Sequence, residues 1–262
     1  MKPQVFCLGG ALVLVGLVQQ FRRISPLTPE QAEILSHMSL VDMPDGQGFH
    51  RTLVITGLNL QLVSGDDDSY SPLQTANLIV GYAVAPTGSH NILHGEGSTI
   101  DRSSGCMVSG RGSSAYQSQN CVVIANQGYV SNGLNDVIVG GSDNSIHHEA
   151  PFSARASVVV GGVSNIICSG EYAFIGGGYT NSLMAHGLAN TIVGGADNLI
   201  GPEPAICFST SPTYTACAIT GGSYNWIHGA EPVTFGATIS GGQFGVVTGS
   251  NDWLAGDLFQ DE

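Results

Sequence analysis

Two groups of side chains in this chain have residue types that bind metal ions. His147, His148 and Glu149 are consecutive, but neighbouring side chains on a strand point to opposite faces, and no third ligand follows at a defined spacing. His90 and His94 are four residues apart, which would place them on one face of a helix, yet they lie among strand and turn signals. We therefore predict no metal site at either group.

Residue patterns typical of enzymes are also missing from the sequence. The three aspartates at 66–68 do not follow the Asp-x-Asp-x-Asp-Gly order with a distal glutamate that calcium loops use, so we expect a solvated loop there. No Gly-x-Ser-x-Gly nucleophile turn and no His-Glu-x-x-His zinc motif occurs. We therefore expect a protein that is not an enzyme, with no catalytic, cofactor-binding or metal-binding residue.

Four aromatic residues offer a different chemistry. Tyr179, Tyr224, Trp226 and Phe244 lie in or just after glycine-rich turns, where their rings could form a stripe that contacts carbohydrate. Aromatic rings also bury large apolar areas in ordinary packing. We expect ordinary packing for these residues and keep the carbohydrate-binding stripe as the alternative.

Five cysteines follow the N-terminal segment. Cys106 and Cys121 are one repeat apart, so they could face each other on adjacent coils, whereas Cys207 and Cys217 bracket a short insertion. Both pairs suit disulfides in an oxidising compartment. Cys168 is left over, and we expect it to be an unpaired, buried thiol that packs as a small hydrophobic residue.

The elements that would position all of these residues come from an internal repeat. A Gly-Gly-x-x-Asn phrase with apolar flanks returns five times, and a sixth copy has Gly245 in place of the asparagine. The five asparagines are Asn144, Asn165, Asn181, Asn198 and Asn225. Weaker copies precede them, beginning near Gly81. Counted between successive glycine pairs, the base period is about 14 to 16 residues, with insertions.

A unit of this length holds two short strands and two turns, which is one coil of a parallel β-solenoid. Glycine pairs allow the chain to reverse direction, and asparagine tolerates the left-handed backbone conformation and can form a hydrogen-bonded ladder between coils. Two apolar columns would fill a thin core. The first holds Ile138, Val159, Ile175, Ile192, Ile219 and Ile239, and the second holds Ile146, Ile167, Leu183, Ile200, Ile227 and Val247.

The early coils are apolar on both sides of their first strand. Because side chains alternate along a strand, the neighbours of the central residue point outward, and they are Val137, Val139, Val158, Val160 and Phe174. Later coils carry mainly threonine or serine there. A strand that is apolar on both faces is usually covered on both. We therefore predict a partner surface, with Val139, Val158, Val160 and Phe174 among the interface residues.

Along the chain, four parts can be distinguished. We assign residues 1–23 to a signal peptide or hydrophobic anchor, 24–75 to an N-terminal helix and strand cap, 76–249 to the repeat domain and 250–262 to an acidic C-terminal cap or tail. The apolar run at 5–18 has the length of a signal-peptide core and is short for a membrane span. Cleavage and retention of this segment both stay open.

The N-terminal cap has a clear helix start. Thr28 is the expected N-cap, and Gln31 completes a capping box. The helix signal ends by Pro44, and two short strands, split by Gly57, follow within residues 51–64. We expect this segment to cover the first coil, because the open end of a solenoid exposes strand edges that favour aggregation.

Composition argues against one class of partner. The formal net charge is −13, and the only lysine is Lys2. Nucleic-acid binding needs concentrated lysine and arginine to contact phosphate, so we expect no nucleic-acid partner. The hydrophobic content of 42% is sufficient for a buried core.

The phrase Val-Ile-Val-Gly-Gly-Ser-Asp-Asn-Ser-Ile at 137–146, together with Gly-Ser-His-Asn-Ile-Leu-His-Gly at 88–95, resembles the head repeats of trimeric autotransporter adhesins, the YadA-like left-handed parallel β-roll. The similarity covers roughly residues 76–249. It implies a homotrimer whose rolls pack about a three-fold axis. The long heptad stalk and the membrane barrel of that family have no counterpart here, and Gly-Gly stands where the family more often has one glycine. We therefore expect a free-standing head.

These patterns predict an all-β fold, a parallel β-solenoid or β-roll of about ten coils of 14–16 residues with a small N-terminal cap, in a homotrimer. We expect a secreted or cell-surface structural or adhesive protein that mediates attachment or surface-layer or fibre assembly. Its partners would be its own copies and surface glycans or matrix proteins, with membrane contact only through residues 5–18 if they stay uncleaved. A phage or virion fibre module is the first alternative. A carbohydrate-active enzyme on a parallel β-helix is the second, which the scarcity of lysine and arginine disfavours.

Overall fold

The computed structural model describes residues 27–44, 49–57, 60, 77–81, 86–148, 156–184, 187–202, 213–229, 233–256 and 258–260. The chain divides into two compact units, Met1–Gln61 and Leu62–Glu262, and each is described by itself. The apolar segment at 5–18, the aspartates at 66–68 and Glu149 lie outside the described residues, so the predictions made for them stay predictions.

The first unit begins with the predicted helix, α2 (Pro29–Ser36). The Thr28 side chain accepts a hydrogen bond from the backbone N–H of Gln31, and the Gln31 side chain accepts one from the backbone N–H of Thr28. This reciprocal capping box satisfies two of the donors that a helix N-terminus leaves unpaired. The predicted helix start is therefore confirmed.

The prediction was wrong about the segment after the helix. A β-hairpin replaces the expected run to Pro44, with β1 (Met38–Pro44) antiparallel to β2 (Phe49–Ile55). In this pairing Leu40 lies opposite Leu53. The strand at 38–44 is stabilised by its cross-strand partner, which a local helix signal does not reveal. Leu60, expected in a second strand, is exposed and not in a strand, and its neighbours at 58, 59, 61 and 62 lie outside the described residues.

The second unit is a stack of parallel strands in two long sheets. The twelve-stranded sheet contains, in spatial order, β3 (Leu78–Val80), β4 (Ile92–Glu96), β6 (Met107–Arg111), β8 (Val122–Asn126), β10 (Val137–Ser142), β12 (Val158–Val160), β15 (Phe174–Ile175), β18 (Thr191–Ile192), β21 (Ala218–Ile219), β24 (Thr238–Ile239), β26 (Trp253–Ala255) and β27 (Leu258–Gln260). The nine-stranded sheet contains β5 (Thr99–Asp101), β7 (Ser114–Tyr116), β9 (Tyr129–Ser131), β11 (Ser145–His147), β13 (Ile166–Cys168), β16 (Ser182–Leu183), β19 (Leu199–Ile200), β22 (Trp226–Ile227) and β25 (Val246–Val247). Two short parallel pairs complete the described strands, β14 (Gly170–Glu171) with β17 (Gly187–Leu188) and β20 (Thr213–Thr215) with β23 (Val233–Phe235).

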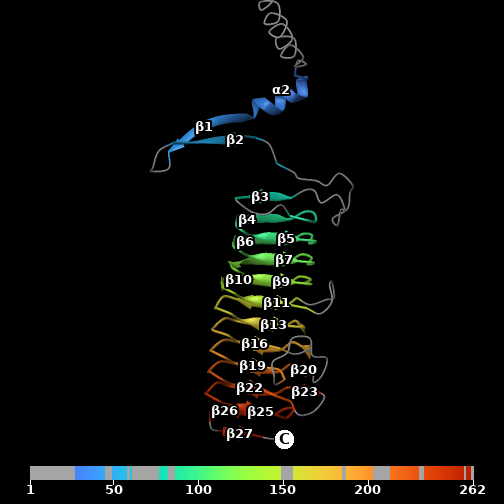
Figure 1. The fold of residues 1–262 in the computed structure, drawn as a ribbon, viewed down its shortest axis with the longest axis vertical. Coiled ribbons are helices and arrows are strands. Elements are labelled where there is room, and N and C mark those ends of the chain that lie inside the picture. The colour runs from blue at the N-terminus through green and yellow to red at the C-terminus, as the bar shows by residue number, and fades with distance from the viewer. Residues whose placement is uncertain are drawn as a thin grey trace, which may run out of the picture. The chain divides into compact units, whose positions relative to one another are not determined.

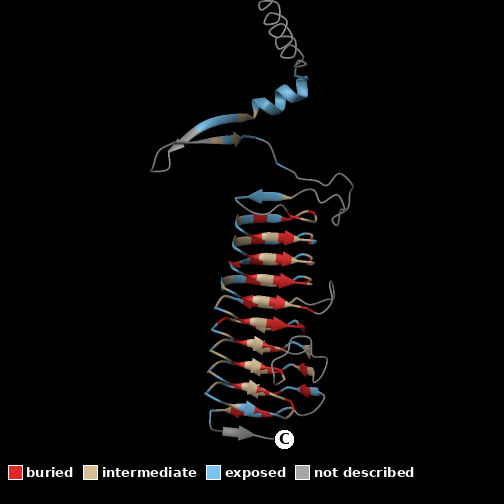
Figure 2. Cartoon of the chain, in the orientation of Figure 1, coloured by how far each residue is buried: buried red, intermediate tan, exposed pale blue. Residues whose placement is uncertain are grey.

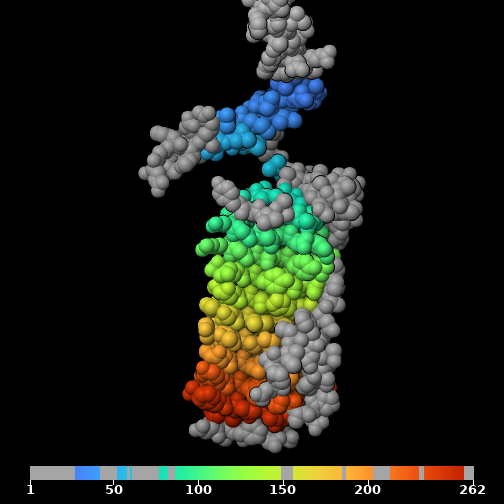
Figure 3. Space-filling view, viewed as in Figure 1, coloured from blue at the N-terminus to red at the C-terminus, as the bar shows by residue number. Residues whose placement is uncertain are grey.

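The chain alternates between the two long sheets, so each passage through both makes one turn of a parallel β-solenoid (Figure 1). Equivalent residues stack in register from coil to coil. Ile138, for example, pairs with Val123 in the coil before and with Val159 in the coil after. The described residues make about nine turns, one for each strand of the nine-stranded sheet. In the space-filling view, successive segments of the chain form successive layers of the stack (Figure 3).

The two predicted core columns are confirmed. All twelve residues are buried, with exposed fractions of 0% to 2%, and they follow one another from strand to strand (Figure 2). Removing this much aliphatic surface from water is the main stabilising term for the solenoid, at about 1.5 to 3 kcal/mol for each fully buried side chain. The core is thin because each coil contributes one residue to each column.

The repeat asparagines form the predicted ladder inside the stack. Nδ2 of Asn181 donates hydrogen bonds to Oδ1 of Asn165 (3.1 Å) and to carbonyl oxygens of glycines in its own coil and the next. The backbone N–H of each later asparagine, through Asn225, donates to Oδ1 of the asparagine in the coil before. These buried amides are therefore satisfied, as buried polar groups must be to avoid a large desolvation cost.

One detail of the turn differs from our expectation. The left-handed backbone conformation is adopted by the residue before each of the five asparagines, and before Gly245 in the sixth copy, with φ between 54° and 58°. These residues are Asp143, Ser164, Thr180, Asp197, Tyr224 and Phe244. The repeat asparagines do not have positive φ, because each leads directly into a strand of the nine-stranded sheet and directs its side chain into the ladder.

The two glycines of each pair have different surroundings. A Cβ at Gly195, where φ is +90°, would overlap the carbonyl oxygen of Gly222 in the next coil. At Gly194, an added Cβ would meet no heavy atom within 4 Å. The second glycine of the pair is thus required by the close approach of adjacent coils.

The C-terminal end of the stack closes with a change of direction. Strand β26 continues the parallel sheet beside β24, and β27 then returns antiparallel to β26. The backbone N–H groups of Thr238 and Ser240 donate to the carbonyl oxygens of Asp252 and Leu254. Strand β26 therefore pairs with the edge of the last coil.

Candidate interaction surfaces

The outer face of the twelve-stranded sheet is apolar over its early strands, as predicted. We call this surface the apolar face. It consists of Ile92, Met107, Val122, Ile124, Val137, Val139, Val158, Val160 and Phe174 on β4, β6, β8, β10, β12 and β15. Five of these side chains, at positions 92, 107, 124, 139 and 160, are between 38% and 45% exposed. The apolar face is therefore a row of partly exposed aliphatic side chains on an otherwise regular stack.

Two polar residues, on β4 and β6, lie on the same side of the sheet as the apolar face. His94 and Ser109 occupy adjacent strands on this side, and Nδ1 of His94 lies 2.9 Å from Oγ of Ser109. On the later strands the same positions hold Thr191, Ala218 and Thr238, beside the exposed Val193. The change from valine to threonine limits the continuous apolar row to the N-terminal half of the stack.

The adjacent histidines at 147 and 148 point in opposite directions, as expected for a strand. His147 is on the outer side of β11, where its ring packs on Tyr129 and lies 3.2 Å from Oγ of Ser131. Partial burial, and to a lesser extent the neighbouring His148, lowers the pKa of His147. His148 is completely buried, with Nε2 2.8 Å from Oδ2 of Asp136.

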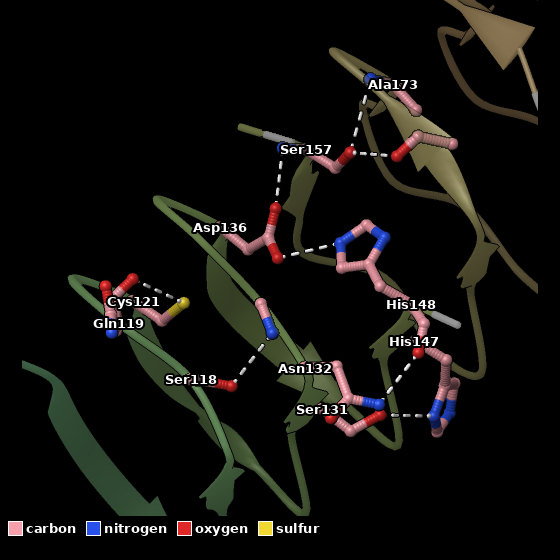
Figure 4. A network of polar contacts seen from close by, with 12 residues as sticks. Ser118, Gln119, Cys121, Ser131, Asn132, Asp136, His147, His148, Ser157 and Ala173 are labelled. Carbon is pink, nitrogen blue, oxygen red and sulfur yellow. Dashed lines mark hydrogen bonds and ion pairs between the residues drawn. The ribbon is translucent and has the colours of Figure 1, made fainter. Parts of the chain in front are cut away.

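Asp136, His148 and Ser157 combine the residue types of a catalytic triad, but their geometry is structural (Figure 4). Oδ1 of Asp136 accepts a hydrogen bond from the backbone N–H of Ser157, and the Ser157 hydroxyl donates to the carbonyl oxygen of Gly170 instead of approaching His148. All three side chains are 0% exposed. A nucleophile must contact both its base and its substrate, so this network links coils and offers no site for a reaction.

The remaining histidine pair is also separated by the fold. His90 lies in a turn at φ 59°, and His94 lies on the outer side of β4. In the part of the chain that the structure describes, no group of three histidine, cysteine, aspartate or glutamate side chains could hold a metal ion.

The two predicted disulfides are wrong. Cys106, Cys121 and Cys217 are buried free thiols, whereas Cys168 is disulfide-bonded and not the unpaired thiol that we expected. Equivalent positions on parallel strands are separated by about 4.8 Å, longer than the roughly 3.8 Å between Cβ atoms in a disulfide. The register of β6 and β8 therefore places Cys106 and Cys121 side by side, but at a spacing that does not favour a disulfide bond.

Two of the free thiols, Cys121 and Cys217, lie in environments that suppress reactivity. The hydrogen bond with the Cys106 thiol, together with burial, raises the pKa of Cys121. Burial raises the pKa of Cys217, whose Sγ donates to the carbonyl oxygens of Thr215 and Thr234. Since the thiolate is the reactive species, neither group is suited to nucleophilic chemistry.

The four aromatic residues do not form one continuous stripe. Tyr224 and Phe244 stack on each other in adjacent turns, with ring centroids 5.2 Å apart. Trp226 lies on β22 instead, where its Nε1 donates to the carbonyl oxygen of Gly201. Tyr179 is 57% exposed. Ordinary packing thus describes Trp226, while Tyr179 and the stacked pair remain on the surface.

A hollow of about 370 Å³, which we did not predict from the sequence, lies at the ends of β4, β6 and β8. We call it the corner hollow. It is lined by Glu96, Gly97, Arg111, Gly112, Asn126 and Gln127. In the sequence, Glu96, Arg111 and Gln127 occupy weak copies of the Gly-Gly repeat. Two oppositely charged residues one repeat apart, Glu96 and Arg111, were the available signal.

No helix among the described residues is long and apolar enough to cross a membrane. The segment proposed as a signal peptide or anchor lies outside those residues.

Comparison with protein-family models found no match to this chain, and comparisons with curated proteins and with solved structures found no significant match.

Proposed function

We propose that this chain is a secreted or cell-surface structural and adhesive protein without catalytic activity, whose copies assemble through the apolar face. The observation that carries this proposal is the row of partly exposed aliphatic side chains that runs from β4 to β15. Exposed apolar patches of this kind are typical of interaction sites. The regular, thin stack suits a rod that presents a surface, and the triad-like set Asp136, His148 and Ser157 is sealed inside it.

The proposed occupant of the apolar face is the same face of other copies of this chain. The face carries no charged side chain that would repel an identical copy, despite the net charge of −13. The resemblance to trimeric adhesin heads supports three-fold symmetry. In such an assembly Val139, Val158, Val160 and Phe174 lie at the interface, and the rod would be held in a homotrimer.

Light scattering with size-exclusion chromatography tests the assembly. We expect the wild-type chain, 27.1 kDa, to elute at three times the mass of one chain at micromolar concentration. Val160→Asp places a charge in an apolar interface, at a cost on the order of several kcal/mol per protomer, and should shift the protein to the mass of one chain.

Thr220→Asp is the matched control, because Thr220 is an exposed residue that follows β21, outside the apolar face. It should leave the mass unchanged. A wild-type protein that elutes as a single chain would show that the homotrimer is wrong.

The second proposal is a phage or virion fibre module, which would also be a trimeric rod. N-terminal sequencing of the mature protein from its native source separates the two. Removal of the segment around residues 5–18 supports export and therefore argues against the fibre module, whereas retention of Met1 is compatible with the fibre module and with an uncleaved anchor.

A further inference from the structure

We propose that the corner hollow is a binding site for a neutral saccharide. The hollow is formed by the last residues of three neighbouring strands. Glu96, Arg111 and Asn126 are register partners at the ends of β4, β6 and β8. The next residue of each coil has a left-handed backbone conformation, with φ of 65°, 65° and 53° at Gly97, Gly112 and Gln127, which turns the chain sharply and leaves a concave corner.

Two opposite charges face this corner without pairing. In the described structure, neither the Glu96 carboxylate nor the Arg111 guanidinium takes part in a hydrogen bond or an ion pair, although the two residues lie on adjacent strands. The backbone at the corner is satisfied independently, since the N–H of Gly112 donates to the carbonyl oxygen of Glu96 and that of Gln127 to the carbonyl oxygen of Arg111. The side chains are thus free to bind a ligand.

Charged side chains stand in this register column only in the first three coils. Beyond Asn126, the column continues along the stack with uncharged residues: Ser142, Val163, Tyr179, Ala196, Ser223 and Gln243. In repeat proteins, residues that vary between coils often lie on the binding face. Glu96 and Arg111 therefore add charged groups at a position where the later coils have uncharged residues.

The ligand class follows from the order of these groups along the stack. Glu96 offers acceptors, Arg111 offers donors, and the amides of Asn126 and Gln127 offer both. A sugar ring carries neighbouring hydroxyl groups, each of which donates and accepts, so it can contact adjacent strands in turn. The methylene stems of Arg111 and Gln127 can pack against its C–H groups.

Charge selects a neutral ligand over an acidic one. The formal charges of Glu96 and Arg111 cancel within the hollow, and the net charge of the whole chain is −13. An anionic sugar would meet both the Glu96 carboxylate and this overall negative field. The site therefore favours an uncharged saccharide.

This inference deepens the proposed adhesive role and rests on it for its biological meaning, whereas binding itself does not require assembly. Saturation-transfer NMR on the full chain tests it with glucose, galactose, mannose and N-acetylglucosamine, alongside glucuronic acid and N-acetylneuraminic acid as acidic probes. We expect saturation transfer to at least one neutral sugar and weaker transfer to the acidic sugars.

Two substitutions place the binding at the corner hollow. Glu96→Gln and Arg111→Met should each weaken the binding of the neutral sugar about tenfold, because each removes hydrogen bonds to a charged group. Arg102→Gln is the matched control, since Arg102 is another exposed arginine outside the hollow. It should bind the sugar as the wild type does.

Three results would overturn the saccharide site: no transfer to any of the four neutral sugars, stronger transfer to the acidic sugars, or equal binding by the two corner variants and the wild type. Far-UV circular dichroism of each variant verifies that the fold is kept. Light scattering of the same samples separates the two proposals. Sugar binding by a single-chain species rejects the assembly alone, and a trimer without sugar binding rejects the saccharide site alone.

Discussion

At the level of single residues, the two glycines of each repeat pair have different structural roles. Gly195 lies where the next coil's backbone leaves no room for a Cβ, and Gly194 lies in open space. Both positions hold glycine, but only Gly195 is required by steric crowding. Alanine substitutions at the two positions should therefore have different effects on stability.

Gly195→Ala should destabilise the solenoid strongly and Gly194→Ala should not. The first change combines a backbone clash with positive φ, and we expect the free energy of unfolding to fall by at least ~2 kcal/mol. The second should change it by less than ~1 kcal/mol. Urea unfolding followed by tryptophan fluorescence measures both, because Trp226 is in the coil next to this turn. Equal destabilisation by the two alanines would contradict this explanation.

The residues at positive φ show a second single-residue effect. Asp143 and Asp197 suit the left-handed conformation, since aspartate visits it more readily than most side chains. Thr180, Tyr224 and Phe244 occupy the same place in other coils. A β-branched or bulky residue is strained there, so neighbouring coils must hold the turn in this conformation.

At the level of elements, each strand depends on the coils beside it and little on distant ones. The N–H groups of Thr238 and Ser240 are paired only through residues 252 and 254 of the final coil. Strand β26 therefore protects the edge of β24 in the same way that each earlier strand protects the one before it.

Ending the chain after Gly249 should expose that edge. Amide hydrogen exchange, read by mass spectrometry, should become faster for residues 238–240, because their hydrogen-bond acceptors are removed. Exchange in β6 should stay unchanged, since contacts in a solenoid are local. We also expect the shortened chain to aggregate more readily. Uniformly faster exchange along the whole stack would show that the solenoid unfolds as one unit and that this local account is wrong.

At the level of the whole molecule, the division between Gln61 and Leu62 separates the helix and hairpin from the solenoid. All strands of the two long sheets belong to the second unit. The solenoid should therefore fold without the first unit. Whether residues 24–75 cover the first coil is a separate prediction.

A fragment of residues 62–262 tests both points. Its far-UV circular dichroism should keep the β-sheet signal, because the stacked coils and their core lie within the fragment. If residues 24–75 cover β3, the fragment should form larger species than the full chain, since the N-terminal edge is then uncovered. An equal number of chains per particle in both proteins would refute the cap, and loss of the β signal would refute independent folding.

The sequence alone determined the architecture of the repeat domain. Glycine, asparagine and isoleucine recur at fixed distances, and in a stack of coils the same backbone geometry recurs at every copy. The core columns and the asparagine ladder follow directly from that periodicity. The capping box of α2 was likewise predictable, because its contacts lie within four residues of each other.

Only the tertiary structure decided features that depend on residues distant in sequence. Strand β1 exists because β2 pairs with it, against a local helix signal. Cys106 and Cys121 remain free thiols, because one-repeat spacing defines a register and not a bonding geometry. The corner hollow joins residues from three coils, and its Glu96 and Arg111 pair with no other residue in the part of the chain that the structure describes, although they are register partners. Periodicity predicts which residues become neighbours, whereas the contacts that those neighbours make depend on side-chain geometry that spacing does not contain.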